Sequence, residues 1–362
     1  MRYAKAMTPT AIDVTRTTTP RPRPNETELG FGKYFADHML VLEYQAPHGW
    51  QEPKVVPYGP LSLDPAASCL HYGQAMFDGM KAFRQADGRV ALFRLNDHAR
   101  RMASGAPRLS MPVVDQALMR DCLTTLVTVD QDWVPSAPGT ALYLRPVLIG
   151  TEPFLGVRPS QQYLFYIITS PVGAYYAAGL KPVKIWVETE AVRAVRGGIG
   201  AVKAAANYVA SLKTADDVRQ RGYEQVLWLD AIEHAFLEEV GTMNLFVVIG
   251  DELFTPPLGG SILAGITRDS VLTLVRDWGL RVTERPVPFS EILTAHKEGA
   301  LREVFGVGTA AVVSSVGELG YADGRLLINK GEVGPIAQRL YTGITDVQYG
   351  RVPDRHGWLT YV

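Results

Sequence analysis

One lysine of this sequence stands in an otherwise apolar stretch of small residues. Lys203 lies between Gly197-Gly198-Ile199-Gly200-Ala201-Val202 and Ala204-Ala205-Ala206. Neighbours of this kind solvate an ammonium group poorly, so the amine loses its proton more easily and can attack a carbonyl carbon. The small side chains also leave room for a flat molecule beside the amine. Taken alone, a lysine in such a place is more often a surface lysine at the start of a helix.

A carboxylate on a second apolar run changes this balance. Glu239 follows Lys203 by 36 positions, in the segment Glu239-Val240-Gly241-Thr242-Met243-Asn244. A pyridoxal phosphate (PLP) site requires a lysine that bonds covalently to the cofactor and an acidic partner for its pyridine nitrogen. The two segments together predict PLP as the cofactor.

PLP also carries a phosphate, for which the sequence offers three weaker signals. Gly265-Ile266-Thr267 precedes a predicted helix, where backbone N–H groups and the helix dipole favour an anion. Thr309 ends the turn Gly306-Val307-Gly308-Thr309 after an apolar strand, and Arg101 could add a positive charge. Ordinary helix caps and a solvated arginine are the alternatives.

Length and composition limit the class of protein. A chain of 362 residues is long enough for two domains. We expect a small N-terminal domain over 1–172 with a mobile Pro-rich arm at 1–28, an interdomain loop at 173–183, and a larger cofactor-binding domain over 184–362. A net charge of -1 gives no electrostatic reason for binding nucleic acid or a membrane surface.

Cysteine usage and hydropathy predict the compartment. The only cysteines, Cys69 and Cys122, form no CxxC, so we expect neither disulfides nor a cysteine-built metal site and assign no metal ligand. No apolar run is long enough to span a membrane, and the Pro-rich lead lacks the apolar core of a secretory signal. We therefore expect a cytoplasmic protein.

The hydrophobic pattern alternates between strands and helices. Asn96 is the predicted cap of a helix ending near Pro107, Asp115 begins a second helix, and Thr267 caps a third that Gly279 ends. Residues 170–181 are expected to be neither strand nor helix. The predicted strands cover 39–44, 90–93, 141–149, 163–168, 183–187, 225–230 and, with a turn, 235–249; a further helix covers about 204–222.

Short motifs along nearly the whole chain carry a family resemblance. They include Phe77-Asp78-Gly79-Met80-Lys81-Ala82-Phe83, Tyr143-Leu144-Arg145-Pro146, Gly150-Thr151-Glu152-Pro153, Asn207-Tyr208 after Lys203, and Glu239-Val240-Gly241-Thr242-Met243-Asn244. The chain resembles the branched-chain amino-acid aminotransferases, of the D-amino-acid-aminotransferase-like group (fold type IV) of PLP enzymes. The resemblance implies a two-domain α/β fold of the α+β type, with a smaller N-terminal α/β domain and a larger C-terminal domain that has a barrel-like sheet.

The resemblance also assigns roles around the cofactor. Lys203 is similar to the lysine that bonds to PLP, and Tyr208 to the residue that hydrogen-bonds its phenolic oxygen. Glu239 is similar to the partner of the pyridine nitrogen; the neighbouring Glu238 is the alternative, but Glu239 stands directly before Val-Gly-Thr-Met-Asn. The phosphate contacts implied by position are Arg101, Ile266, Thr267 and Thr309.

On the substrate side, the resemblance implies an aromatic and aliphatic cage with a few polar groups. The cage residues are Phe31, Phe77, Tyr143, Val157 and Tyr175, with Arg145 and Tyr143 available to the side-chain carboxylate of glutamate. The α-carboxylate would meet the backbone N–H groups of Ala310 and Ala311 and a hydroxyl of Tyr72 or Thr242. Core packing is the alternative for each aromatic residue.

In the family, Tyr72 and Val157 would reach the site from the partner subunit, which implies a homodimer. Mammalian relatives carry a CxxC where this chain has Ala311 and Ser314. Thiol-based control at that position is therefore not expected here.

The activity that the resemblance implies is reversible, ping-pong transamination in branched-chain amino-acid biosynthesis or degradation. Amino acids and 2-oxo acids are the expected partners: L-leucine, L-isoleucine or L-valine react with 2-oxoglutarate to give branched-chain 2-oxo acids and L-glutamate. Three alternatives remain open at this point: a D-amino-acid aminotransferase, a PLP lyase acting on aminodeoxychorismate, and a PLP-binding protein without amino-transfer activity.

Overall fold

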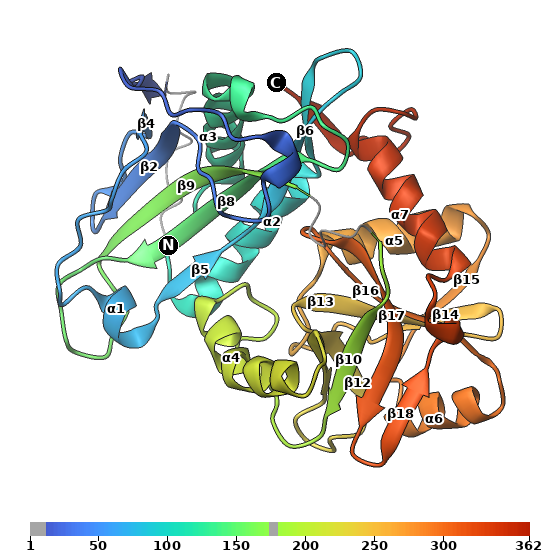
Figure 1. The fold of residues 1–362 in the computed structure, drawn as a ribbon. Coiled ribbons are helices and arrows are strands. Elements are labelled where there is room, and N and C mark those ends of the chain that lie inside the picture. The colour runs from blue at the N-terminus through green and yellow to red at the C-terminus, as the bar shows by residue number, and fades with distance from the viewer. Residues whose placement is uncertain (1–11, 174–179) are drawn as a thin grey trace. The chain divides into compact units, whose positions relative to one another are not determined.

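The computed structural model describes residues 12–173 and 180–362. The described residues form two compact units (Figure 1). The first unit holds the residues up to Gly173 together with Gly357–Val362, and the second holds the residues from Leu180 to His356. The chain therefore returns to the first unit for its last strand. None of the helices in the described ranges is both long and apolar enough to cross a membrane.

The first unit is built on a mixed sheet. Within the described residues, β1 pairs in parallel with β4, and the other neighbouring strands are antiparallel. The main strand order is β1 (Asp13–Val14), β4 (Lys54–Pro57), β2 (His38–Gln45), β9 (Gln162–Val172), β8 (Ala141–Gly150), β6 (Met80–Arg84), β7 (Val90–Phe93) and β19 (Leu359–Tyr361); β3 (Gly49–Trp50) pairs with β2, and β5 (Ala75–Phe77) with β8.

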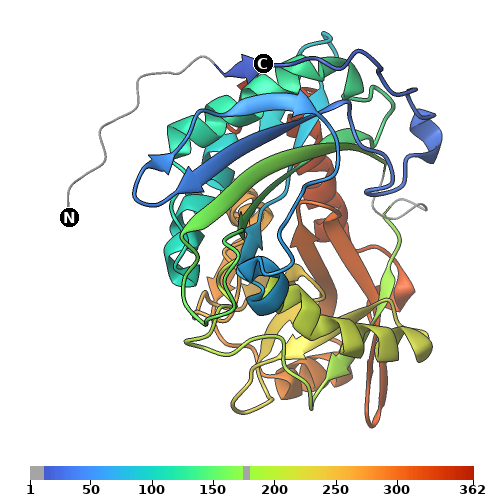
Figure 2. The ribbon, with the colours of Figure 1, turned by 90° about the vertical axis from the view of Figure 1, so that its left-hand side faces the viewer.

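Two long strands and two helices organise this unit. β8 and β9 pair along their length, from Ala141 opposite Val172 to Gly150 opposite Tyr163. The helices α2 (Leu95–Gly105) and α3 (Gln116–Val129) contact each other and lie along one face of the sheet (Figure 2). α3 buries Met119, Leu123 and Leu126 at helical spacing, which is the apolar stripe that covers a sheet. The short helix α1 spans Ser68–Tyr72, and single 3-10 turns cover Glu26–Glu28, Ala106–Leu109 and Gln131–Trp133.

The sheet of the second unit closes on itself. β12 pairs with both β11 and β13, so β10, β11, β12, β13, β16 and β17 form a closed ring. In order, the strands are β12 (Leu237–Val240), β11 (Gln225–Leu229), β10 (Val183–Glu188), β17 (Val312–Tyr321), β16 (Leu301–Gly308), β13 (Met243–Ile249), β14 (Glu252–Thr255) and β15 (Arg281–Glu284), with β18 (Gly324–Leu327) beside β17. This ring confirms the predicted barrel-like sheet.

Apolar side chains from the ring strands pack into one cluster. Ile185, Leu227, Leu245, Val304 and Val316 are each no more than 2% exposed and come from five different strands of the ring. Such a cluster fixes the relative positions of the strand ends and the turns that they carry. The helices of this unit are α4 (Ala205–Gln220), α5 (Ile266–Asp277), α6 (Phe289–Lys297) and α7 (Pro335–Gln348), with a 3-10 turn at Asn329–Gly331.

Most of the predicted elements are present, and the differences lie at their ends. Asp115 caps α3 as predicted, by accepting from the N–H groups of Ala117 and Leu118. The predicted caps at Asn96 and Thr267 are wrong, because α2 begins one residue before Asn96 and α5 begins after Gly265. β9 also runs through residues 170–172, which the sequence did not predict to be strand.

Candidate active site

Lys203 lies two residues before the start of α4, beside a tyrosine of that helix. Its Nζ donates to the Tyr208 hydroxyl at 2.7 Å, and both residues are half-buried. The preceding loop is held by the buried side chain of Asn207, which donates to the carbonyls of Ile199 and Val202 at 2.9 and 2.8 Å. A rigid loop of small residues therefore holds the amine at a fixed position next to a phenol.

Glu239 on β12 is a buried carboxylate with three partners. Its Oε2 forms an ion pair with Arg193 Nε at 3.0 Å, and its Oε1 accepts from Leu263 N and Asn244 Nδ2, both at 3.1 Å. Burial raises the pKa of Glu239, although the Arg193 guanidinium, the Leu263 N–H and the Lys203 ammonium each favour its ionised form. The carboxylate is thus held in one orientation with a cation beside it.

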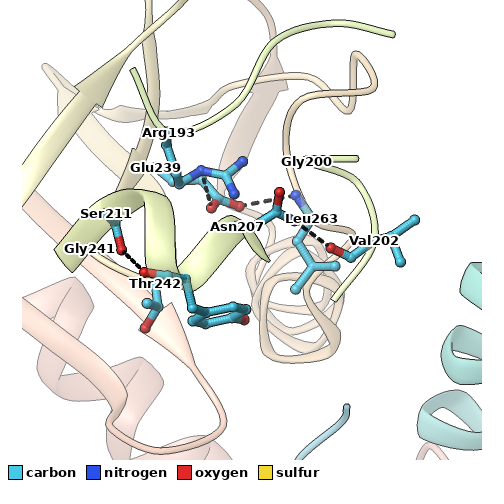
Figure 3. A pocket seen from close by; sticks show the side chains of 10 residues that line it. Arg193, Gly200, Val202, Asn207, Ser211, Glu239, Gly241, Thr242 and Leu263 are labelled. Carbon is cyan, nitrogen blue, oxygen red and sulfur yellow. Dashed lines mark hydrogen bonds and ion pairs between the residues drawn. The ribbon is translucent and has the colours of Figure 1, made fainter. Parts of the chain in front are cut away.

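The neighbouring Glu238 has a different environment. Consecutive strand residues point to opposite faces, and Glu238 accepts from the Ser261 hydroxyl. Burial raises the pKa of Glu238, against the opposing effects of Ser261 and Arg193. The pocket in Figure 3 is lined by Glu239 and not by Glu238. Its lining residues are Arg193, Gly200, Val202, Asn207, Tyr208, Ser211, Glu239, Gly241, Thr242 and Leu263.

Two turns and a helix start gather at the same end of the ring. Asn244 on β13 pairs with Val307 on β16, so the Gly241–Thr242 turn and the turn after Gly308 lie at the same end of adjacent strands. Asn244 also donates to the Leu263 carbonyl at 2.9 Å, shortly before the start of α5. The sequence-predicted residues Thr242, Ile266, Thr267, Thr309, Ala310 and Ala311 all belong to these segments.

These segments present backbone groups suited to anions. Gly265 precedes α5 and has no side chain that could cap the helix, and the first helical residues Ile266 and Thr267 are buried. The free N–H groups of a helix start attract phosphate. At the other turn, Val312 has φ +64°, a backbone conformation that is unusual for a β-branched residue and is often found at functional sites.

Arg101 lies on α2 in the first unit, where a buried aspartate orients it. Asp78 Oδ2 accepts from Arg101 Nε at 2.8 Å, and Asp78 Oδ1 accepts from Arg101 Nη2 at 2.6 Å. The same Oδ1 lies 2.8 Å from His98 Nδ1. Burial alone would raise the pKa of Asp78, but Arg101 and His98 outweigh it and hold the pKa well below its usual range. Asp78 is therefore an anion that fixes the guanidinium.

Three of the predicted cage residues lie together with Arg145 in the first unit. Phe31 contacts Tyr143 edge to face, with ring centroids 5.0 Å apart. Tyr143 and Arg145 are two positions apart on β8, so they share a face of the sheet; Arg145 Nη2 donates to the Tyr143 hydroxyl at 3.1 Å. The Arg145 guanidinium lies 4.6 Å from the ring centroid of Phe77.

This aromatic group, formed by Phe31, Phe77, Tyr143 and Arg145, offers apolar surface beside an arginine with a hydrogen-bond donor that the described residues leave unused. Arg145 Nε is buried and has no hydrogen-bond partner among the described residues. A buried donor of this kind is costly unless a ligand satisfies it. Burial raises the pKa of Tyr143, so its hydroxyl stays protonated and can donate. The group is suited to an apolar side chain and, alternatively, to a carboxylate.

The remaining predicted residues lie elsewhere. Tyr72 at the end of α1 and Val157 are 45% and 86% exposed, and the Tyr72 hydroxyl donates to the carbonyl of Leu155. They are part of an exposed apolar surface and not of the aromatic group around Tyr143. Tyr175 lies outside the described residues.

Comparison with known proteins now identifies the family. The sequence profile of the family "Amino-transferase class IV" matches residues 75–319. The chain belongs to the class IV aminotransferases. It is 51% identical to branched-chain-amino-acid aminotransferase 2 of Bacillus subtilis (strain 168), over 98% of each chain. The predicted resemblance to branched-chain aminotransferases is thereby confirmed.

Solved structures of class IV aminotransferases agree with this assignment. The branched-chain amino acid aminotransferase of Escherichia coli superposes with a TM-score of 0.73 at 27% identity, over 84% of this chain and 95% of that one. The branched-chain aminotransferase of the thermophilic archaeon Thermoproteus uzoniensis, solved with norvaline, gives a TM-score of 0.74 at 25% identity, over 90% and 99%. The predicted fold class, that of the fold type IV enzymes, is confirmed.

Three residues of the candidate site were missed by the sequence analysis. Asp78 lies within a quoted motif, and its signal was an acidic residue in a run of mostly apolar residues. Arg193 and Asn244 hold Glu239, but nothing in their sequence context indicates this contact. Asn244 ends the Glu239–Asn244 motif, and its role follows from the hairpin that places it opposite Glu239.

Gly79→Ala tests the aromatic group. A Cβ at position 79 would overlap the hydroxyl and ring of Tyr143, so we expect Tyr143 to be displaced. Because a misplacement of about 1 Å can cost on the order of 100-fold in rate, kcat/KM for L-leucine should fall by roughly 10- to 100-fold while bound PLP stays at the wild-type level. Gly59→Ala, where a Cβ meets open space, is the control. Equal kinetics of the two variants would contradict a role for Tyr143 in the site.

Proposed function

We propose that the chain catalyses PLP-dependent transamination between L-leucine, L-isoleucine or L-valine and 2-oxoglutarate, by a ping-pong mechanism. Two contacts beside the pocket carry the proposal. Lys203 donates a hydrogen bond to the Tyr208 hydroxyl, and Glu239 is buried beside Arg193. The names of the relatives favour branched-chain substrates over the D-amino-acid aminotransferase and lyase alternatives.

The residues of the second unit fit PLP. Lys203 supplies the amine for the covalent bond, Tyr208 a hydroxyl for the phenolic oxygen, and Glu239 a fixed carboxylate for the pyridine nitrogen. The start of α5 at Ile266 and Thr267, and Thr309 in the other turn, offer donors to a phosphate; from the first unit, Arg101 would add a cation. When bound, PLP supplies an electron sink for the carbanion that forms when the substrate loses its α-proton.

Lys203 is the residue proposed to move the proton. Its Nζ would take the α-proton of the amino acid as a base and then donate it as an acid to C4′ of the cofactor within the same half-reaction, and in the second half-reaction it would move a proton in the reverse direction. The Tyr208 hydroxyl, 2.7 Å from Nζ, keeps the amine directed at one place. Glu239, buried beside Arg193, would hold a negative charge next to the pyridine nitrogen of the cofactor.

The aromatic group in the first unit is proposed to bind both substrate types. Phe31, Phe77 and Tyr143 offer apolar and ring-edge surface to a branched side chain. Arg145, with its buried Nε, and the protonated Tyr143 hydroxyl are suited to the side-chain carboxylate of glutamate. The α-carboxylate is assigned to the N–H groups of Ala310 and Ala311 and to a hydroxyl of Tyr72 or Thr242.

A homodimer is proposed to complete the site. Five apolar side chains on α1 and on the loop hydrogen-bonded near it are between 41% and 86% exposed: Leu70, Tyr72, Phe154, Leu155 and Val157. Clustered exposed apolar side chains mark a surface that another protein covers. A second copy in a two-fold arrangement would cover this surface and bring Tyr72 and Val157 to the partner's site. Tyr175, as a further cage residue, and a cytoplasmic location remain part of the proposal.

Lys203→Ala tests the chemistry. With 15N-labelled L-leucine and 2-oxoglutarate, the wild-type enzyme should produce 15N-glutamate, detected by mass spectrometry. Loss of the proton-transferring amine should lower the rate by more than about 1,000-fold. Lys213→Ala is the control, because Lys213 lies on α4 with an exposed side chain paired with Asp217. Substantial labelling of glutamate by the Lys203 variant would refute the proposed role.

Leu155→Asp tests the dimer. A charge in the exposed apolar surface should oppose its burial against a second copy, so sedimentation at micromolar concentration should show the wild type as a dimer and the variant shifted toward monomer, with lower specific activity. Leu327→Asp, at a 56% exposed position on β18, should leave the assembly unchanged. A monomeric, fully active wild type would contradict the proposal.

A further inference from the structure

The Pro-rich segment before the cage is bound to the first unit along its length. β1 pairs with β4, Thr15 N donates to the Val55 carbonyl at 2.9 Å, and Thr17 N donates to His38 Nε2 at 2.9 Å. His38 is itself held by Asp130, with Nδ1 and Oδ1 2.7 Å apart. The sequence suggested a mobile arm over 1–28, and these contacts of residues 13–17 were not predicted.

Asp37 binds the middle of this segment. Its Oδ1 accepts from Arg21 N at 2.8 Å, and its Oδ2 accepts from Arg23 Nη1 at 3.0 Å and from Trp133 Nε1 at 2.9 Å. Burial alone would raise the pKa of Asp37, but the hydrogen bonds from Arg21, Trp133 and Arg23 outweigh it, so the pKa lies below its usual value. At 7% exposure, Asp37 is a buried charge whose partners come from the Pro-rich segment and from the 3-10 turn after α3.

The prolines lower the entropic cost of fixing this segment on the first unit, so that few contacts are enough to hold it there. Pro20, Pro22 and Pro24 alternate with the two arginines, and each proline restricts the backbone before folding, so less entropy is lost when the segment binds. The arginines also stack on aromatic rings: the Arg21 guanidinium lies 4.4 Å from the Tyr58 centroid, and that of Arg23 lies 3.9 Å from the Trp133 centroid.

The C-terminal end of the segment, residues 26–30, directly precedes Phe31 of the aromatic group. The Glu26 carboxylate accepts from the backbone N–H groups of Ser136 and Ala137 at 3.0 and 2.7 Å. Leu29 is 1% exposed, and the Gly30 carbonyl accepts from Gly173 N at 2.9 Å. The next residue is Phe31, whose ring contacts Tyr143.

We propose that Asp37 is a positioning residue for the substrate cage. By binding Arg21 and Arg23, it fixes residues 15–28 on the first unit, and the C-terminal end of this segment then holds Phe31 against Tyr143. Asp37 touches neither substrate nor cofactor in this account, and the inference rests on the proposed function only in taking Phe31 as part of the cage. Loosening the segment should therefore weaken substrate binding more than it slows the chemistry.

The kinetic test compares Asp37→Ala and Asp37→Asn with the wild-type holoenzyme. A loss of uniform binding raises KM with little change in kcat. We expect Asp37→Ala to raise KM for L-leucine by roughly 3- to 10-fold, with kcat within about twofold and bound PLP unchanged. Asp37→Asn keeps one side-chain oxygen as an acceptor, so its KM should lie between those of the wild type and Asp37→Ala. Asp87→Ala is the control, because Asp87 forms an exposed ion pair with Arg89 on the same unit. A rise in KM equal to that of the control would overturn the inference.

A second measurement does not depend on activity. Hydrogen exchange of peptides covering 26–33 should be faster in Asp37→Ala than in the wild type, and unchanged exchange would overturn the inference. Glu26→Ala loosens the same segment at its other end, so it should reproduce the rise in KM even if Asp37→Ala does not fold. A wild-type protein that does not transaminate leucine would defeat the proposed function, whereas normal leucine turnover with unchanged exchange or KM in the variants defeats only this inference.

Discussion

The buried carboxylate of Glu239 is the constraint on which the second unit depends. A charge in a protein interior must be compensated, and here Arg193, Asn244 and the Leu263 N–H supply the compensation. These partners come from three separate segments, so the closed ring has to bring them together. The same arrangement fixes the Gly241–Thr242 turn and the start of α5. The segments that compensate the charge of this one carboxylate therefore also form the place proposed for a flat, charged cofactor.

In the first unit, two buried aspartates likewise hold other groups in place. Asp78 fixes the guanidinium of Arg101, and Asp37 fixes the Pro-rich segment that leads to Phe31. In each case a buried anion directs a cation or a backbone segment, and the anion itself does not reach the proposed ligand. The aromatic group around Tyr143 depends in addition on close packing, because only a glycine at position 79 leaves room for the phenol. In the proposed site, recognition would thus depend on residues that themselves touch no substrate.

The sequence predicted the chemistry better than the geometry. Lys203 and Glu239 were predicted as site residues because a lysine and a glutamate are conspicuous in apolar, small-residue runs. Long periodic strands such as β8 and β9 were placed within a few residues of their observed bounds. Helix starts were misjudged at Asn96 and Thr267, since a polar residue near a helix end is a weak signal when glycine or a left-handed residue takes the cap. Arg193 and Asp37 could not be predicted, because their partners are distant in sequence and only the folded chain brings them together. For the same reason, the contacts of residues 12–28 could not be predicted, and these residues were placed in a mobile arm over 1–28.

The most direct test of the central claim is the absorbance spectrum of the purified holoenzyme during successive additions of L-leucine and 2-oxoglutarate. The account predicts that the visible band of the bound aldehyde cofactor disappears with leucine alone and returns with 2-oxoglutarate, because each half-reaction can proceed without the other substrate. A band that is insensitive to leucine but responds to D-alanine would contradict the branched-chain substrate class. Protein that shows no such band after PLP is supplied would contradict the assignment of Lys203 and Glu239 to a cofactor site.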